Sequence, residues 1–319
     1  MALSTTLFSG CKKDSSGKKN TSSKSSAFKL AITDKVRNIP VTDLLPPIGP
    51  RTGKFKKDVS EKVKDDYMYG TLAGQYGKTF VAIDYLKKAL KAEPKFIDAH
   101  HNLGLAYYKL GRVDDAIDEW RITLSLDPRY AETYYNLGVF LFHQNREKDG
   151  IALLKRCIEI DAHHLKARFA LAKTYQQQGN YHEAIRHFQA YKIKDRGNLQ
   201  VLINLGELYL LVGQVQSSLK EFESAVRIDD KNPLIHYQLG IAYQRNKVYA
   251  SALHHFRRAL DLSPDYTDAY TNMGDIFLAR REYASALSSY NAALSANPRN
   301  PYVAKRVAEM EKKLADREP

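Results

Sequence analysis

One hexapeptide in this chain has the residue types of a phosphate-binding loop. Residues 74–79 read Gly-Gln-Tyr-Gly-Lys-Thr, and such a loop holds phosphate oxygens with backbone N–H groups and a lysine. The motif requires another glycine five residues before Gly77, where this chain has Leu72. We therefore expect a turn between two helices here, with no nucleotide, no other cofactor and no small-molecule substrate.

Histidine and cysteine could bind metal or act as nucleophiles, but their spacing suits neither role. The His pairs at 100–101, 163–164 and 254–255 are adjacent, and neighbouring helical residues point about 100° apart. Cys157 stands alone and is expected to be a buried core thiol. We predict no metal site, no catalytic residues and no enzyme activity.

The spacing that organises the chain is a period of 34 residues. Counted from Val63, seven units without insertions span 63–300, and six carry glycine at position 8, while the fourth carries Ala172. These glycines are Gly70, Gly104, Gly138, Gly206, Gly240 and Gly274. A fixed period of this length predicts stacked pairs of helices.

Small and large residues alternate with this period. Position 20 is small in every repeat: Ala82, Ala116, Gly150, Ala184, Ser218, Ala252 and Ala286. Position 24 is large in every repeat: Leu86, Trp120, Leu154, Phe188, Phe222, Phe256 and Tyr290. We expect the two helices of a pair to cross at positions 8 and 20, with the large residue filling the remaining space.

Turn residues recur in the same register. Position 15 holds glycine or asparagine, which tolerate left-handed dihedral angles, in all repeats except those with Lys247 and Arg281. Position 32 holds Pro94, Pro128, Pro264 and Pro298, which end the second helix. The central repeats lack this proline, and we expect their joints to be less firmly specified.

These residues resemble the tetratricopeptide repeat family over 63–300. The resemblance implies an all-α, right-handed superhelical solenoid of seven helix-turn-helix repeats. Repeat 1 departs most from the pattern and is expected to be a terminal cap. Asn300 and Pro301 suit the start of a helix, and we expect a polar capping helix within 301–319, to about Ala315.

In the resembled fold, positions 2, 5, 6, 9, 12 and 13 of the first helices line a concave groove. Position 6 carries an amide in five repeats: Asn102, Asn136, Asn204, Gln238 and Asn272. An amide both donates and accepts hydrogen bonds, so this series could hold an extended peptide backbone. The alternative is that these side chains simply point into water.

Apolar and charged side chains complete the expected groove. The apolar residues are Tyr108, Tyr135, Val139, Phe142, Phe169, Ile203, Leu210, Leu211, Tyr237 and Ile241. Such an exposed strip usually binds a partner, although burial between helices would also explain it. Repeat 4 has Ala170 in the amide series and places Phe169 and Lys173 in the groove, so we expect discrimination between partners there.

The positive charge of the chain lies mainly before the repeats. The net charge is +13, and residues 1–62 contribute +8 of it, from 13 Lys and Arg against 5 Asp and Glu. This distribution argues against a repeat array that binds nucleic acid. A solvated basic tail and attraction to anionic lipid headgroups both stay open.

Residues 7–11, Leu-Phe-Ser-Gly-Cys, look like a bacterial lipobox, in which the cysteine receives diacylglycerol. We read 1–11 as a signal-peptide remnant with lipidation at Cys11, and 12–62 as a basic, Ser-, Lys- and Pro-rich tether. Residues 1–10 lack a basic start and are short, so the motif is accidental or the true start precedes Met1. Within the tether, the Pro-rich residues 39–50 could pack on repeat 1 or enter the groove.

The layout resembles bacterial tetratricopeptide-repeat lipoproteins. It implies a protein-binding scaffold anchored through Cys11 in the cell envelope, with the outer membrane favoured, that assists assembly of a membrane-associated complex. The predicted peptide-binding residues are Asn102, Tyr108, Tyr135, Asn136, Phe142, Phe169, Lys173, Asn204, Tyr237 and Asn272. Two alternatives stay open: a soluble cytoplasmic scaffold, and a regulatory subunit of a separate enzyme.

Overall fold

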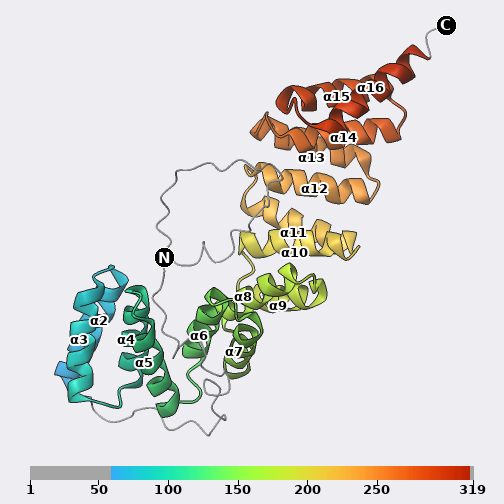
Figure 1. Cartoon of the computed structure of the whole chain (residues 1–319). Coiled ribbons are helices and arrows are strands. Elements are labelled where there is room, and N and C mark those ends of the chain that lie inside the picture. The colour runs from blue at the N-terminus through green and yellow to red at the C-terminus, as the bar shows by residue number, and fades with distance from the viewer. Residues whose placement is uncertain (1–58, 317–319) are drawn as a thin grey trace. The chain divides into compact units, whose positions relative to one another are not determined.

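The computed structural model describes residues 59–316, which contain fifteen α-helices and no strand (Figure 1). Within this range no helix combines the length and apolar character needed to cross a membrane. The expected lipidation site Cys11, most of the expected tether and the Pro-rich residues 39–50 lie outside the described residues. The expected fold class, an all-α repeat solenoid, is confirmed.

Fourteen of the helices follow one another in the chain as seven pairs, each joined by a tight turn. The first helices are α2 (Glu61–Gln75), α4 (Ile97–Lys109), α6 (Ala131–His143), α8 (Leu165–Gln177), α10 (Leu199–Leu211), α12 (Pro233–Arg245) and α14 (Thr267–Ala279). The second helices are α3 (Thr79–Ala92), α5 (Val113–Leu126), α7 (Glu147–Ile160), α9 (Tyr181–Lys194), α11 (Val215–Ile228), α13 (Tyr249–Leu262) and α15 (Tyr283–Ala296). Helix α16 (Pro301–Ala315) follows the last pair.

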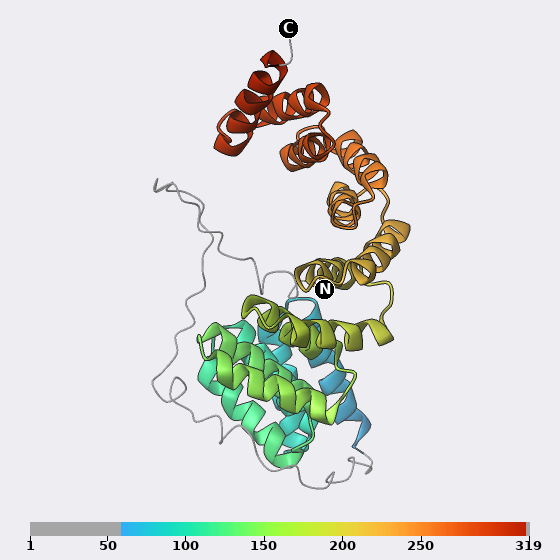
Figure 2. The same ribbon diagram turned by 90° about the vertical axis from the view of Figure 1, so that its right-hand side faces the viewer.

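The chain divides into two compact units, at residues 1–171 and 172–319, with the boundary inside α8. Figure 2 shows that helix pairs follow one another in chain order within each unit. In the second unit the apolar side chains form one cluster after another, each joining a second helix to the first helix that follows it. The second unit therefore has the layered core of a repeat protein.

The two helices of a pair approach closely because position 8 lacks a side chain. A Cβ atom at Gly206 would lie 2.6 Å from the ring of Phe222, and one at Gly240 would lie 2.6 Å from the ring of Phe256. Both rings are completely buried. For these two pairs, the structure therefore confirms the predicted close approach at position 8, with the large residue at position 24 filling the space.

All seven turns between paired helices share one backbone geometry. Position 15 has a positive φ in every repeat, from 57° at Asn145 to 76° at Gly77, Gly179 and Gly213. Lys247 and Arg281 adopt φ of 60° despite their side chains. Lys247 and Arg281 therefore add backbone strain at their turns, but the chain follows the same path there as at the glycine turns.

The second helices also end in one register, with or without proline. Helices α7, α9 and α11, which have no proline at position 32, end at position 30 like α3, α5, α13 and α15. An aspartate follows each of the three, and its Oδ1 accepts the backbone N–H two residues later, as Asp161 does from His163 at 2.9 Å. This Asx turn fixes the path without proline, although Asp127 forms the same turn beside Pro128 in repeat 2. Whether these joints are more flexible stays a prediction.

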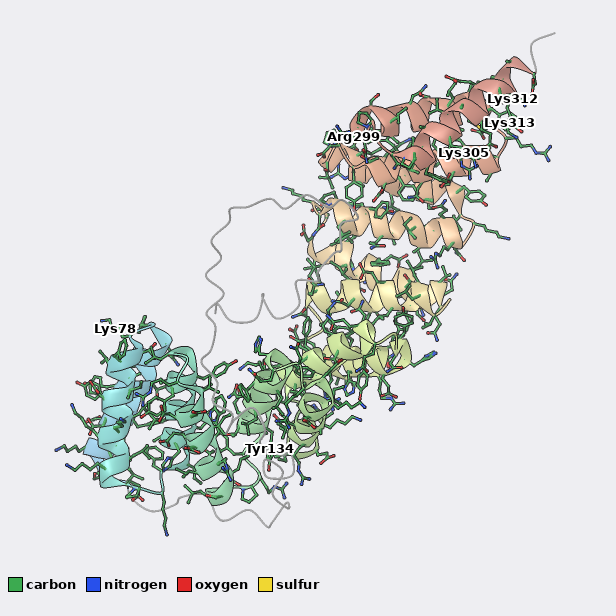
Figure 3. All side chains as sticks on the ribbon, viewed as in Figure 1. Lys78, Tyr134, Arg299, Lys305, Lys312 and Lys313 are labelled. Atoms are coloured by element: carbon green, nitrogen blue, oxygen red, sulfur yellow. The ribbon has the colours of Figure 1, made fainter. Side chains whose placement is uncertain are left out.

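The predicted C-terminal helix is present as α16. The Asn300 side chain accepts the backbone N–H groups of Tyr302 and Val303, and Pro301 is the first helical residue. Val303 and Met310 are completely buried against the preceding pair. Lys305 and Lys312 are exposed on α16 (Figure 3), while Lys313 Nζ lies 5.3 Å from the centroid of the Tyr283 ring, so most of the remaining surface is charged.

Candidate functional site: the line of first helices

In the first unit, the amides at position 6 are bonded to the preceding repeat. Asn102 Nδ2 lies within hydrogen-bond distance of Tyr67 Oη at 3.1 Å and of Thr71 Oγ1 at 3.2 Å. Asn136 Nδ2 donates to His101 Nε2 at 3.4 Å. Both amides therefore join neighbouring first helices.

The second unit repeats this arrangement. Asn204 Oδ1 accepts from Lys173 Nζ at 3.1 Å, and Gln238 Nε2 donates to Glu207 Oε1 at 3.0 Å. Asn272 Nδ2 donates to Tyr237 Oη at 3.2 Å. In both units the partner stands at position 5 or 9 of the preceding repeat, so position 6 is a recurring joint between repeats.

These bonds change the interpretation of the amide series. The sequence left two uses open, a peptide or solvent, and the structure shows a third, in which the amides stabilise the stacking of repeats. Asn204 is only 2% exposed and also donates to the carbonyl oxygen of Gln200, so it presents almost no surface to a ligand. Asn102, Asn136 and Asn272 are half-buried, and their role in peptide binding stays a prediction.

A charged cluster lies at positions 2 and 34 in the first unit. Glu132 receives His164 Nε2 at 2.6 Å on one oxygen and Lys166 Nζ at 2.9 Å on the other. The hydrogen bond from His164 is the largest cause that lowers the pKa of Glu132 to about 2. Tyr135 lies between these groups, its ring centroid 5.2 Å from that of His164, and burial raises its pKa to about 12. Tyr135 is thus held neutral beside an ionised carboxylate.

The second unit has a half-buried pair of charges, Lys173 and Glu207, at position 9 of neighbouring repeats. Burial lowers the pKa of the Lys173 ammonium, while nearby Glu207 opposes the shift. Burial likewise raises the pKa of Glu207, against the opposing effect of Lys173. The two groups partly compensate each other, so this stretch presents polar atoms with little net charge.

A cavity of about 180 Å³ opens between α2 and α4. Its floor is apolar, with Leu86 and Ala106, and its rim carries Thr71, Asn102 and Lys109. The remaining lining residues are Gly70, Gly74, Gln75, Ala82 and Leu105. The volume is below that of pockets for drug-sized ligands and suits a single anchoring side chain.

The rim of this cavity is held by the joint between repeats 1 and 2. Lys109 Nζ donates to the carbonyl oxygen of Gly74 at 2.9 Å, and Asn102 bonds to Tyr67 and Thr71 on α2. The lysine remains exposed to solvent. The cavity therefore has a fixed polar rim, and a ligand there would meet a positive charge.

The expectation of a continuous exposed apolar strip is wrong. Ile203 is 6% and Leu210 is 5% exposed, because both pack in the core between α10 and the helices beside it. Leu211, by contrast, is 55% exposed. The others are half-buried: Tyr108, Tyr135, Val139, Phe142, Phe169, Tyr237 and Ile241. Burial between helices, the alternative weighed from sequence, explains most of this set.

The aromatic residues predicted to bind a peptide also pack against other side chains of the protein. Tyr108 lies 5.7 Å from Trp120 between ring centroids, and Tyr237 lies 4.9 Å from Tyr266. The Phe142 ring packs over Gly150, since a Cβ there would be 3.1 Å from it. Each of these rings keeps part of its surface accessible, so a partner could still contact it.

The residues that sequence reasoning left out of the site lie around the cavity. Thr71, Gln75 and Leu105 occupy groove positions 9, 13 and 9, but none was among the predicted peptide-binding residues, which begin with Asn102 in repeat 2. Lys109 was likewise not among the predicted peptide-binding residues. Their positions within the repeat could have identified these residues from the sequence. The cavity could not be identified in this way, because it depends on how closely α2 and α4 approach.

The residues that resemble a phosphate-binding loop, and the cysteine Cys157, have structural roles. Gly77 and Lys78 form the turn before α3, in agreement with the turn predicted from sequence. Cys157 is completely buried, as expected, and burial raises the pKa of its thiol. Across residues 59–316, no group of three His, Cys, Asp or Glu side chains could hold a metal ion.

Three family models match the chain. One described as Tetratricopeptide repeat matches 101–164 and 237–301, and a second with that description matches 141–196. A third, described as TPR repeat, matches 75–111 and 201–247. Together the matched ranges run from 75 to 301 with one short interruption. The sequence matches none of the curated proteins.

Solved structures with the same fold support this match. The C-terminal part of a TPR repeat-containing protein from Cytophaga hutchinsonii is 13% identical with a TM-score of 0.60, covering 76% of this chain and 99% of that one. YrrB, a TPR protein described as having an unusual peptide-binding site, is 19% identical with a TM-score of 0.54. That match covers 60% of this chain and 97% of YrrB. At these identities the likeness concerns the fold alone.

Proposed function

Since the chain belongs to the tetratricopeptide repeat family, we propose that it is a non-catalytic scaffold that binds a peptide segment of another protein on its first helices. The observation that carries the proposal is the cavity between α2 and α4, with its apolar floor and polar rim. We infer that one apolar side chain of the partner enters it, while the partner backbone lies along the rim.

The polar atoms at the rim suit a peptide better than a free small molecule. Thr71 and Gln75 offer both donors and acceptors, which match the alternating N–H and C=O groups of a backbone. Lys109 adds a positive charge at the edge, where an acidic residue or a terminal carboxylate of the partner would be favoured. The YrrB relative, which has a peptide-binding site, supports this class of ligand without identifying it.

A peptide library displayed on phage and selected against the full chain tests the proposal. We expect enriched sequences to share one apolar anchor residue. Leu105→Asp should abolish their binding, and Lys109→Ala should weaken it severalfold. Arg121→Ala, an exposed position on the second helix α5, is the matched control. Enriched peptides that bind the Leu105→Asp protein normally would contradict this site.

We further propose that Cys11 carries a lipid and anchors the scaffold in a bacterial envelope. The support is the lipobox-like sequence at 7–11 and the Lys- and Ser-rich residues that follow it. An anchored scaffold of this kind would assist assembly of a membrane-associated complex by bringing its partner to the membrane surface.

Metabolic labelling with an alkyne fatty acid in a bacterial host tests the anchor. The full chain should take up the label and fractionate with membranes, and Cys11→Ala should do neither. Equal labelling and solubility of both proteins would contradict the anchor and favour a soluble cytoplasmic scaffold. An enzyme activity that appears only with a co-purified partner would instead favour a regulatory subunit.

A further inference from the structure

Each first helix uses one fixed face to pack on the repeat before it. In α12, this face comprises Ile235, Leu239 and Ala242, at positions 3, 7 and 10, which pack with Phe222 and Ala225 of α11. Ala269, Met273 and Ile276 of α14 make the same contact with α13. In repeats 2 to 7, every residue described at positions 7 and 10 is at most 9% exposed.

Helix α16 closes the C-terminal end with this same face. Val303 and Met310 occupy the equivalents of positions 3 and 10, and both pack completely buried against Ala286 and Tyr290. The rest of α16 is rich in exposed charge. The stack thus ends in a helix that covers apolar surface on one side and is polar on the other, as repeat arrays require for solubility.

At the other end, α2 presents positions 7 and 10 of this face without cover from the described residues, while its position 3 is the exposed Asp65. Tyr69 and Leu72, at positions 7 and 10, are 53% and 41% exposed. Met68, at the amide position, and Tyr76, at position 14, are 47% and 80% exposed. Position 14 also points toward the preceding repeat, because Asn246 there accepts from Gln216 of α11. We call Met68, Tyr69, Leu72 and Tyr76 the N-terminal face.

We propose that residues 39–50 of the same chain cover the N-terminal face. This segment contains five large aliphatic residues, Ile39, Val41, Leu44, Leu45 and Ile48. It also contains four prolines, at 40, 46, 47 and 50, which cannot lie inside a helix. We therefore expect the cover to be extended chain, in contrast to the helix α16 at the other end.

The length of the connection permits this contact. Ten residues, 51–60, separate the segment from the start of α2 at Glu61, and an extended chain spans roughly 33 Å over that number. The fifteen residues of α2 are about 22 Å long. The segment can therefore turn back and run beside α2 from Met68 to Tyr76.

The same connection favours this occupant over a second copy of the protein. A short flexible linker holds its segment near the face at an effective concentration on the order of millimolar. Another molecule at micromolar concentration would have to bind about a thousandfold more tightly to compete. This contact is separate from the proposed peptide site, so either can fail without the other.

Photocross-linking in the full chain tests the contact. The probe p-benzoylphenylalanine replaces Leu45 or Ile48, and replaces Phe28 in the control. Probe protein is mixed with isotopically heavy protein without the probe, so links within and between chains differ in mass. We expect probes at 45 and 48 to link to residues 68–76 of their own chain, with little linkage from position 28.

Two substitutions test whether the cross-links depend on the N-terminal face. Leu72→Asp should reduce the cross-link yield severalfold, because it places a charge in the middle of the face. Phe80→Asp should leave the yield unchanged, because Phe80 is 73% exposed at position 18, outside the N-terminal face. Links mainly to the heavy chain would overturn the proposal in favour of self-association. Links elsewhere, or equal linkage from position 28, would also overturn it.

Discussion

At the residue scale, position 8 shows how a missing side chain organises this protein. A Cβ at Gly206 would meet the rigid Phe222 ring at 2.6 Å, whereas one at Gly138 would meet the flexible Leu154 side chain at 3.1 Å. Glycine inside a helix costs about 1 kcal/mol relative to alanine. In these pairs glycine leaves room for the large residue at position 24, whereas repeat 4 accommodates Ala172 together with the buried Phe188.

Replacing these glycines by alanine should separate the two cases. Gly206→Ala should destabilise the protein by about 1–3 kcal/mol, because overpacking against an aromatic ring exceeds the gain in helix propensity. Gly138→Ala should cost less than Gly206→Ala, because the nearest atoms are 3.1 Å from the added Cβ, on Leu154, and 3.2 Å from it, on the Gly150 carbonyl oxygen. Urea unfolding followed by far-UV circular dichroism measures both. Equal midpoints for the two variants would show that contact with position 24 is not what excludes a side chain.

His101 makes stability depend on pH. Since an amide nitrogen only donates, Asn136 Nδ2 requires an unprotonated His101 Nε2, and His101 Nδ1 must then donate to Thr133 Oγ1 at 2.8 Å. Burial lowers the pKa of His101 from 6.5 to about 4, against the opposing effect of Glu132 and Asp98. Between these two pKa values the unfolded chain binds the proton and the folded chain does not. Stability should therefore fall as pH decreases from 6.5 toward 4.

The size of this loss is of the order of 1–3 kcal/mol. His101→Gln should reduce the difference in urea midpoint between pH 7 and pH 4.5, because glutamine does not titrate. The exposed His163 provides the control substitution His163→Gln. His255, whose pKa burial also lowers to about 4, contributes a similar slope that both variants retain. An unchanged pH dependence in His101→Gln would contradict the assignment.

At the element scale, the turns between paired helices require a left-handed residue at position 15. Lys247 has φ of 60°, which costs a side-chain-bearing residue roughly 1–2 kcal/mol. Lys247→Gly should relieve part of this strain and stabilise the protein by about 0.5–1 kcal/mol. Thermal unfolding of the variant beside Lys247→Ala, which keeps the strain, measures the gain.

The reverse substitution tests the same geometry. At Gly213 an added Cβ would meet no atom within 4 Å, so Gly213→Lys adds backbone strain without a steric clash. It should destabilise the protein by about the amount that Lys247→Gly gains. A Gly213→Lys variant as stable as the original chain would show that these turns relax without cost.

The sequence predicted the helices and turns more completely than it predicted the candidate site. Period, crossing residues, turns and α16 follow from local rules of size and backbone geometry, so Gly206, Gly77 and Asn300 could be placed in advance. The amide at Asn102 could not be placed, because its role depends on Tyr67 and Thr71 in the repeat before it. Ile203 and Leu210 were misplaced because the packing of α10 against its neighbours buries them.

At the scale of the whole molecule, stability in a repeat protein depends on contacts between neighbouring repeats and on what closes each end. The apolar residues at positions 7 and 10 of a first helix are buried by the helix pair that precedes it. Helix α16 supplies the last such contact through Val303 and Met310. The end of the stack is therefore where a single substitution should have an effect that decays along the chain.

Met310→Asp tests this decay within the second unit. A carboxylate at a completely buried site should release α16 and expose Tyr290, which raises amide exchange in α14 and α15. Exchange in α10 and α11 should change little, because α16 packs mainly on α15. Lys305→Asp, on the exposed side of α16, controls for the change in charge. An equal rise of exchange from α10 to α15 would show instead that the unit unfolds as one cooperative block.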